Sequence, residues 1–401
     1  MRPEEVIRSA LDEKLIVGAS MVVRKNGVEV VHTNQGYADV ERQIPVSDDT
    51  LFRLASMSKP VTAVAAMQLI EQGKLGLDDR LGRWIPEFGN MKAAKEPIGF
   101  DEVQKYVADP DNPLMAKMLK ARLDGIELID VGDEITIRDL LTHSSGLGMG
   151  LVSQQAIEEC IVPGDRLGAR VKRFAATPLD FVPGTMTGYS AITGFDVLGR
   201  IIEIVSGEEL DEYVRKHIAR PLGTDELGFS LTDAQQGRVA RLYEHGADGT
   251  QTDVTESDQL WRQVDPGRGY YSGSAGMIGS LMAYDRFVQM LAGNGAYGGA
   301  RILRPETVAA IRTERAKHGL EFMPGVVWGL GMAVFSEFGR SGRYLGEGTF
   351  GWSGAYGTHF YIDTANDITV TLMVQSSNIG GAGSPLSMKL EEAVYRTFVE
   401  A

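Results

Sequence analysis

Strand-like segments stand near both ends of this chain, and helical segments occupy most of the stretch between them. Near the N-terminus, Asn26-Gly27 separates two β-rich runs, a pattern typical of a tight hairpin with positive φ in its turn. Near the C-terminus, residues 327–335, 344–363 and 367–375 are strand-like. Strands that arise from both ends, with hairpin turns among them, predict an α+β fold with an antiparallel sheet.

Helical patterns account for most of the remaining chain. Residues 58–72 are apolar on more than one side, which predicts a buried helix that ends at Gly73. Further helices are expected at 3–14, 112–125, 193–207, 207–223, 279–295 and 387–400, with a short helix and a Ser/Gly turn within 135–148. We therefore expect a sheet domain of residues 1–75 and 265–401, and a mostly helical subdomain of residues 76–264.

Charge and composition exclude several kinds of partner. The 401 residues carry a net charge of −14, which disfavours nucleic acid and anionic membrane surfaces. No apolar run is long enough to span a bilayer, and the N-terminus lacks the apolar core of a signal peptide. We expect a cytoplasmic protein, or a periplasmic one if a signal was removed. Cys160, the only cysteine, excludes an internal disulfide and is expected to be an inert thiol.

Cofactor and metal motifs are missing from the sequence. The six histidines show no HxxxH or HxH spacing, and no phosphate-binding GxxxxGK[ST] is present. We therefore expect no cofactor and no metal. A GxSxG motif is also absent, which argues against an α/β-hydrolase.

The strongest local signal for chemistry is Ser56-Met57-Ser58-Lys59, the only Ser-x-x-Lys in the chain. Spacing of three places Ser56 and Lys59 on one helix face, where the amine can take the hydroxyl proton. An isolated motif of this kind also occurs as a capping serine beside a solvated lysine. Here it stands between a polar loop and an apolar helix, and Pro60 is tolerated in that helix's first turn.

Two further segments supply candidate groups. Tyr189-Ser190 follows a Pro-Gly turn and opens a helical run, so Tyr189 is a candidate partner of Lys59, although a buried structural tyrosine is the alternative. Tyr270-Tyr271-Ser272 is a rival that we rank lower, because a tight SGSAG turn follows. In the third segment, Gly351-Trp352-Ser353-Gly354-Ala355, glycines within a strand indicate close backbone approach.

Together, in this order, the three segments resemble the serine β-lactamase and penicillin-recognising family over residues 5–400. The resemblance implies that Ser56 is the acylated nucleophile and that Lys59 and Tyr189 form its base system. It also implies an oxyanion hole made by the Ser56 and Ala355 N–H groups. The active site would lie between the sheet domain and the helical subdomain. His143, in LLTHSSG, is expected to be structural, with its ring tying the Ser-Ser-Gly turn.

Departures from the family pattern indicate the branch. Ala191 stands where β-lactamases usually have asparagine, and Trp352-Ser353-Gly354 replaces their Lys-Thr-Gly. A neutral tryptophan favours neutral esters over anionic drugs, and the chain is most similar to family VIII carboxylesterases. Trp352 and Gly354 are therefore expected to bind substrate, a small ester.

Other activities of the same machinery remain open. They are those of an amidase, a D-aminopeptidase, a β-lactamase or a transesterase, and a non-catalytic penicillin-binding-like protein is a further alternative. Residues 95–130 exceed a minimal connection, and our hypothesis is that they cover the cleft.

Overall fold

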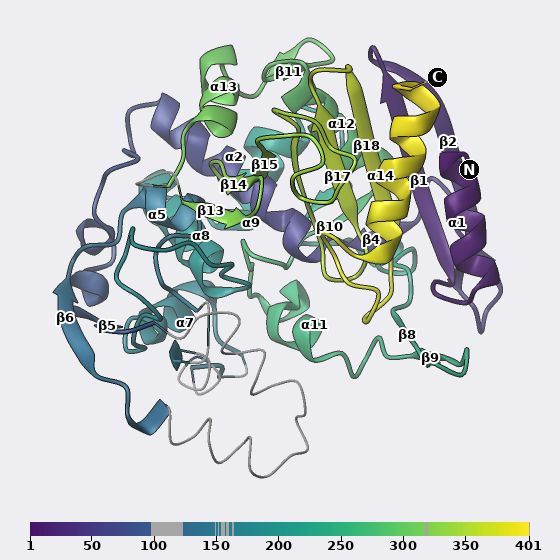
Figure 1. Cartoon of the computed structure of the whole chain (residues 1–401). Coiled ribbons are helices and arrows are strands. Elements are labelled where there is room, and N and C mark those ends of the chain that lie inside the picture. The colour runs from purple at the N-terminus through teal and green to yellow at the C-terminus, as the bar shows by residue number, and fades with distance from the viewer. Residues whose placement is uncertain are drawn as a thin grey trace.

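The computed structural model describes residues 1–97, 123–148, 150, 152, 153, 157, 160–162, 164–316 and 320–400. A nine-stranded antiparallel sheet runs through it (Figure 1). Its strands, in spatial order, are β13 (Glu321–Met323), β14 (Val326–Trp328), β15 (Ala333–Phe335), β16 (Phe350–Ser353), β17 (His359–Asp363), β18 (Ile368–Val374), β1 (Gly18–Lys25), β2 (Val28–Asp39) and β3 (Ile44–Pro45). The predicted α+β class is confirmed.

The two ends of the chain meet in the middle of this sheet. β1 pairs antiparallel with β18, from Ala19 opposite Val374 to Lys25 opposite Ile368. The β1–β2 hairpin turns through Asn26 (φ 53°) and Gly27 (φ 73°), as the sequence predicts. The N-terminal strands β1, β2 and β3 therefore complete a sheet whose other strands, β13 to β18, come from residues 321–374.

Helices cover both faces of the sheet. On one face lie α12 (Leu281–Ala292) and α2 (Ser58–Glu71), and on the other α14 (Pro385–Phe398), with α1 (Pro3–Asp12) packed beside it (Figure 1). Neighbouring residues of β17 point to opposite faces: Phe360 meets the ring of Tyr284 of α12 edge-on, and His359 lies 3.2 Å from Glu391 of α14.

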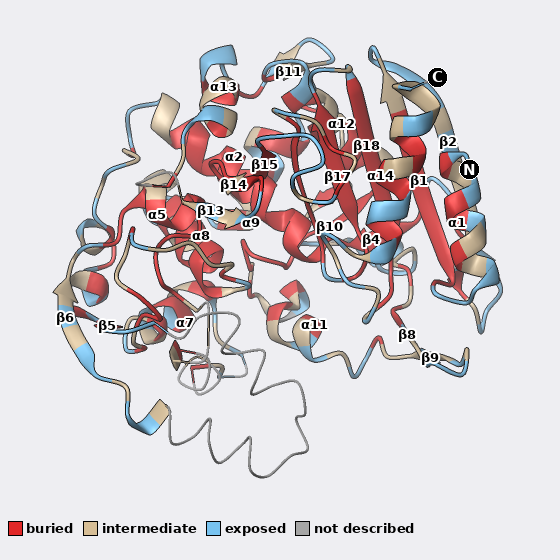
Figure 2. Ribbon diagram, in the orientation of Figure 1, coloured by how far each residue is buried: buried red, intermediate tan, exposed pale blue. Residues whose placement is uncertain are grey.

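Helix α2 runs through the interior of the molecule and is buried along most of its length (Figure 2). Every residue from Ser58 to Leu69 is buried, as its apolar sequence predicts. Gly73, at φ 67°, follows the helix end in the left-handed conformation that favours glycine. The Pro60 ring fits in the first turn, where no intrahelical N–H bond is lost.

The remaining helices gather beside α2. Helix α8 (Thr193–Ser206) packs against α2, α5 (Ile137–Leu141), α7 (Leu167–Phe174) and α9 (Leu210–Val214). The helix expected at 207–223 is α9 followed by a π-helical turn, 215–219. The other elements are β4 (Leu51–Arg53), β5 (Met91–Ala94), β6 (Leu128–Gly132), β7 (Leu227–Gly228), α10 (Asp233–Gln236), β8 (Tyr243–His245), β9 (Gln251–Asp253), α11 (Gln259–Val264), β10 (Ile278–Ser280), β11 (Ala296–Tyr297), β12 (Ala300–Arg301) and α13 (Pro305–Thr313).

Two expectations remain predictions. The helix at 112–125 and the covering segment 95–130 fall largely on residues 98–122, which lie outside the described residues. The proposed domain boundaries are likewise a prediction. In the small sheet β4-β10-β7, β7 of the expected helical subdomain pairs with β10 of the expected sheet domain.

Candidate active site

Ser56 lies in a single 3₁₀ turn, Ala55–Met57, between β4 and α2. Its side chain is nearly buried, with 9% of its surface exposed. The turn begins with Ala55 at φ 45°, a left-handed conformation that an L-residue adopts at a cost. Chain direction therefore changes sharply just before Ser56, and the serine stands at the N-terminal end of α2, as the sequence predicts.

Lys59 is fully enclosed on the first turn of α2, with 1% of its surface exposed. Its Nζ lies 3.2 Å from Ser56 Oγ, 2.6 Å from the Ala191 carbonyl oxygen and 3.1 Å from the Ser274 carbonyl oxygen. The structure thus brings the predicted Ser56–Lys59 pair together, as the i, i+3 spacing requires. The two carbonyl groups come from distant segments and carry no sequence signal of their own.

Tyr189 lies half-buried beside this pair. Its ring centre is 4.9 Å from Lys59 Nζ, and its hydroxyl oxygen accepts a hydrogen bond from Trp352 Nε1 at 3.2 Å. Within the described residues, that hydroxyl makes no hydrogen bond to Ser56 or Lys59. The structure therefore brings Tyr189 to Lys59 through its ring, and to Trp352 through its hydroxyl.

An aromatic cluster surrounds Tyr189. Trp328 of β14 is buried, stacks on Tyr189 with 5.8 Å between ring centres and meets Trp352 edge-on at 4.5 Å. Sequence analysis missed Trp328, although it stands in one of the predicted strand segments. The three rings of Tyr189, Trp328 and Trp352 thus form an aromatic wall on one side of Lys59.

His143 packs against the segment that contains Tyr189 and Ser190. Its Nδ1 accepts a hydrogen bond from the Ser190 N–H at 3.1 Å, and its ring packs against Tyr189 and Trp328. Burial, and secondarily the charge of Lys59, hold the pKa of His143 well below its usual value, so the ring stays neutral. A structural role was expected, but the expected target was wrong: the ring ties Ser190 rather than the Ser-Ser-Gly turn.

The rival segment, residues 270–274, is anchored by a buried carboxylate. Asp196 of α8 accepts hydrogen bonds from the Tyr270 hydroxyl, the Ser272 hydroxyl and the Ser274 N–H. Tyr270 is buried, so it presents no hydroxyl to a cleft. The segment contributes instead the Ser274 carbonyl oxygen that Lys59 contacts. Asp196 was not anticipated, because an aspartate within a helical pattern is usually solvated.

The third segment approaches the nucleophile turn closely. Ser353 ends β16, and a Cβ on Gly354 would lie 2.3 Å from the Leu54 carbonyl oxygen, so only glycine fits there. Thr358 Oγ1 donates to the same oxygen at 3.0 Å. Gly354 is therefore a packing position. Ala355 follows in an exposed turn, and its N–H donates to no group in the described part of the chain.

The opposite face of β16 carries a buried polar chain. Ser353 Oγ lies 2.7 Å from His359 Nδ1, His359 Nε2 lies 3.2 Å from Glu391, and Glu391 pairs with Arg343. Burial raises the pKa of Glu391, but its contacts with His359 and Arg343 outweigh burial and lower it. This chain ties β16 and β17 to α14. It resembles a Ser-His-Glu triad in composition, but all four side chains are buried on the side away from Lys59.

Among the described residues, no three His, Cys, Asp or Glu side chains are gathered so that they could hold a metal ion. The same part of the chain contains no helix with the length and apolarity needed to cross a membrane. Cys160 is buried.

Comparison with known proteins identifies the family. The β-lactamase family model matches residues 4–387, which is nearly the whole chain. The chain belongs to the β-lactamase family. Within it, the chain is 32% identical to Esterase EstB of Burkholderia gladioli, over 98% of this chain and 94% of that protein.

Solved structures of two hydrolases have a similar fold over nearly the whole chain. The structure of "EstCE1, a hydrolase with promiscuous acyltransferase activity" superposes with a TM-score of 0.76 and 28% identity, covering 98% of this chain and 97% of that one. A family VIII carboxylesterase has the same fold, with a TM-score of 0.69 at 21% identity over 98% and 96% of the two chains. The sequence-based assignment to the serine hydrolases of this family is confirmed.

Proposed function

We propose that this β-lactamase family protein is a carboxylesterase that cleaves small, short-chain esters through an acyl-enzyme on Ser56. The observation that carries the choice is Trp352. Its neutral indole occupies the position where a β-lactamase would hold a lysine for an anionic drug, and it donates to the Tyr189 hydroxyl. The similarity to Esterase EstB supports ester hydrolysis.

The proposed first half-reaction uses the enclosure of Lys59. In its unprotonated form the amine donates its two hydrogens to the Ala191 and Ser274 carbonyl groups, which leaves its lone pair facing Ser56 Oγ. Oγ attacks the ester carbonyl carbon while its proton passes to the amine. The N–H groups of Ser56 and Ala355 stabilise the oxyanion.

The tetrahedral intermediate then collapses to the acyl-enzyme. The bond between the carbonyl carbon and the alcohol oxygen breaks, and the leaving oxygen takes the proton that Lys59 accepted from Ser56, relayed by the Tyr189 hydroxyl after it turns toward the amine on substrate binding. In the second half, water loses a proton to the same groups, attacks the acyl carbon and releases the acid and Ser56.

The test compares p-nitrophenyl butyrate with nitrocefin on the wild-type protein, the Ser56→Ala variant and the control Ser257→Ala, which alters an exposed serine. We expect fast ester turnover that is lost only in Ser56→Ala, with weak or no nitrocefin cleavage. Strong nitrocefin turnover would make the protein a β-lactamase. Ester turnover that survives in Ser56→Ala would remove Ser56 as the nucleophile.

Acyl transfer is the second candidate, favoured by the similarity to a hydrolase with promiscuous acyltransferase activity. The aromatic wall of Trp328 and Trp352 would favour an alcohol over water at the acyl-enzyme. Added 1-butanol would then divert p-nitrophenyl butyrate into butyl butyrate, measured by gas chromatography. If only butyric acid forms, the acyl-enzyme reacts with water alone.

A further inference from the structure

A cavity of about 560 Å³ lies beside the strand that leads to Ser56. Arg53, the last residue of β4, lines it together with Trp261 of α11. The rest of the wall is largely polar, with Arg241, Glu256 and Asp265 among its charged side chains, and Phe229, Leu231 and Ile278 belong to its apolar part. The volume suits a small organic molecule.

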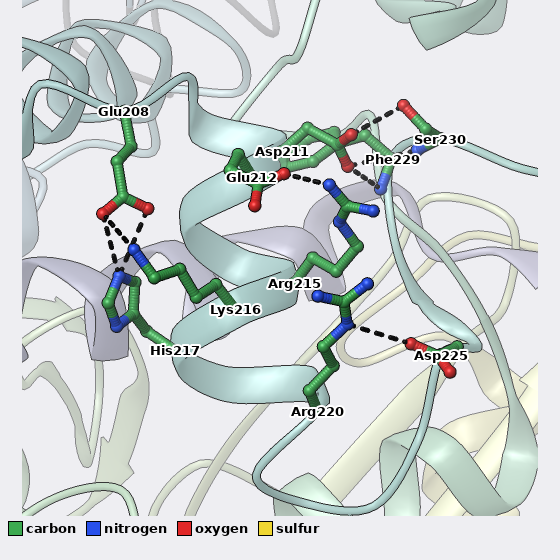
Figure 3. A network of polar contacts seen from close by, with 10 residues as sticks. All are labelled: Glu208, Asp211, Glu212, Arg215, Lys216, His217, Arg220, Asp225, Phe229 and Ser230. Carbon is green, nitrogen blue, oxygen red and sulfur yellow. Dashed lines mark hydrogen bonds and ion pairs between the residues drawn. The ribbon is translucent and has the colours of Figure 1, made fainter.

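Asp211 holds in place the part of the cavity wall that Phe229 and Ser230 form. Asp211 accepts hydrogen bonds from the N–H groups of Phe229 and Ser230 and from the Ser230 hydroxyl (Figure 3). Because both backbone groups and the hydroxyl are engaged by one carboxylate, this side of the cavity is structurally fixed. A preformed wall lowers the entropy cost of binding.

Arg53 is the unusual group in this cavity. Only 7% of its surface is exposed, and its guanidinium lies 4.9 Å from the centre of the Trp261 ring. One nitrogen, Nη1, donates to the Ala240 carbonyl oxygen at 2.7 Å. Within the described residues, Nε is buried without a hydrogen-bond partner, and no carboxylate lies within ion-pair distance of the guanidinium. A buried guanidinium normally has such a partner.

The other charged groups of the cavity are already occupied. Arg241 pairs with Asp253 at 2.6 Å and with Glu256 at 3.5 Å. Asp265 accepts the Gly267 N–H at 2.9 Å. Among the charged side chains that line this cavity, the Arg53 guanidinium is therefore the one where an anion would gain most, and a ligand carboxylate could pair with the part of it that faces the cavity.

We propose that this cavity binds a small monocarboxylate, with its carboxylate on Arg53 and its apolar body against Trp261 and Phe229. The inference rests on Arg53 and the cavity, and does not depend on the proposed esterase activity. The site is close to the nucleophile turn, because Ala55, directly before Ser56, packs in the same apolar cluster as Trp261. A bound carboxylate would therefore lie near the turn without occupying the groups around Lys59.

Isothermal titration with benzoate tests the proposal, with neutral benzamide of the same shape as the comparison. The protein used is the Ser56→Ala variant, which removes the predicted nucleophile from the measurement. We expect Kd for benzoate to be at least about tenfold lower than for benzamide. Arg53→Met should weaken benzoate binding by about tenfold or more, whereas Arg262→Met, the same change on an exposed arginine of α11, should leave it unchanged.

A second variant covers the case in which Arg53→Met does not fold. Val239→Phe keeps Arg53 and fills the cavity from a partly exposed position of its wall, and Val162→Phe on the surface is its control. We expect only Val239→Phe to abolish binding. Equal affinity for benzoate and benzamide, or benzoate binding that needs Tyr189 but tolerates both cavity variants, would overturn the proposal. Equal affinities would show that the cavity does not recognise the carboxylate. Binding that tolerates both cavity variants would place the ligand at the Ser56 site.

Discussion

Two segments of this protein contain a Tyr-Ser pair, Tyr189-Ser190 and Tyr271-Ser272. A backbone carbonyl group that follows each pair contacts Lys59. Lys59 Nζ contacts the carbonyl oxygen of Ala191, two residues after Tyr189, and that of Ser274, two residues after Ser272. Tyr189 differs in its surroundings from Tyr270, which directly precedes the Tyr271-Ser272 pair of the second segment. Tyr189 is half-buried and its hydroxyl accepts from Trp352, whereas Tyr270 is buried and its hydroxyl donates to Asp196.

The difference in partner decides the chemistry that each hydroxyl can perform. Burial and the negative charge of Asp196 hold the pKa of Tyr270 well above its usual value, so this tyrosine remains a phenol. The Tyr189 hydroxyl oxygen instead accepts a hydrogen bond from the Trp352 N–H, so its own hydrogen can be donated to a substrate. Tyrosines of two similar segments thus become one candidate for proton transfer, Tyr189, and one structural anchor, Tyr270.

Removing the lysine that the two segments share should have the largest effect. For Lys59→Met we expect kcat/KM for p-nitrophenyl butyrate to fall by about a thousandfold or more, because the predicted base is lost. The two carbonyl groups also lose their donor, so unfolding by urea should begin at lower concentration. Activity within tenfold of the wild type would remove Lys59 from the mechanism.

The matched pair Tyr189→Phe and Tyr270→Phe compares the two hydroxyl groups directly. We expect Tyr189→Phe to lower kcat by about 10²–10⁴ with little change in stability. Tyr270→Phe should leave kcat within a few-fold and lower the free energy of unfolding by about 1–3 kcal/mol, because Asp196 loses a donor. Steady-state kinetics and urea unfolding measure both, and the reverse pattern would exchange the roles of the two segments.

The Trp352→Phe variant tests the hydrogen bond that the Tyr189 hydroxyl accepts from Trp352. The variant keeps an aromatic ring against Trp328 but removes the N–H that reaches Tyr189. We expect kcat to fall about tenfold, the value of one hydrogen bond to a partly charged oxygen. The same substitution in the Tyr189→Phe background should cost nothing further, and a double-mutant cycle on kcat detects any departure from that result.

The smallest expected effect is on the pH dependence of stability. Burial raises the pKa of Asp196 above 3.8, although hydrogen bonds from Tyr270, Ser272 and Ser274 oppose it. The folded state therefore holds a proton that the unfolded state has lost, and stability falls as pH rises from about 3.8 to the raised pKa. The slope is at most about 1.4 kcal/mol per pH unit. Asp196→Asn should remove this slope in urea unfolding at several pH values, and an unchanged slope would show that Asp196 is not its source.

Local patterns in the sequence predicted much of this molecule. The Asn26-Gly27 hairpin, the buried helix α2 and the Ser56–Lys59 spacing follow from residues close together in the chain, where backbone geometry decides the outcome. The family resemblance supplied Tyr189 and Trp352. That they are hydrogen-bonded to each other was not predictable, since 163 residues separate them. The same holds for the carbonyl groups at Lys59, the Asp196 anchor and the partner of His143, which depend on tertiary packing.

The positive φ of Ala55 limits what can be varied beside the nucleophile. β-Branched residues are strained in this conformation, whereas glycine adopts it freely and asparagine tolerates it. Because Ala55 is also buried in an apolar cluster, active clones of a library randomised at position 55 should be rich in Ala and Gly, and poor in Val, Ile and Thr. Variants selected for a new substrate should therefore carry their substitutions in the aromatic wall, whereas position 55 should remain nearly unchanged.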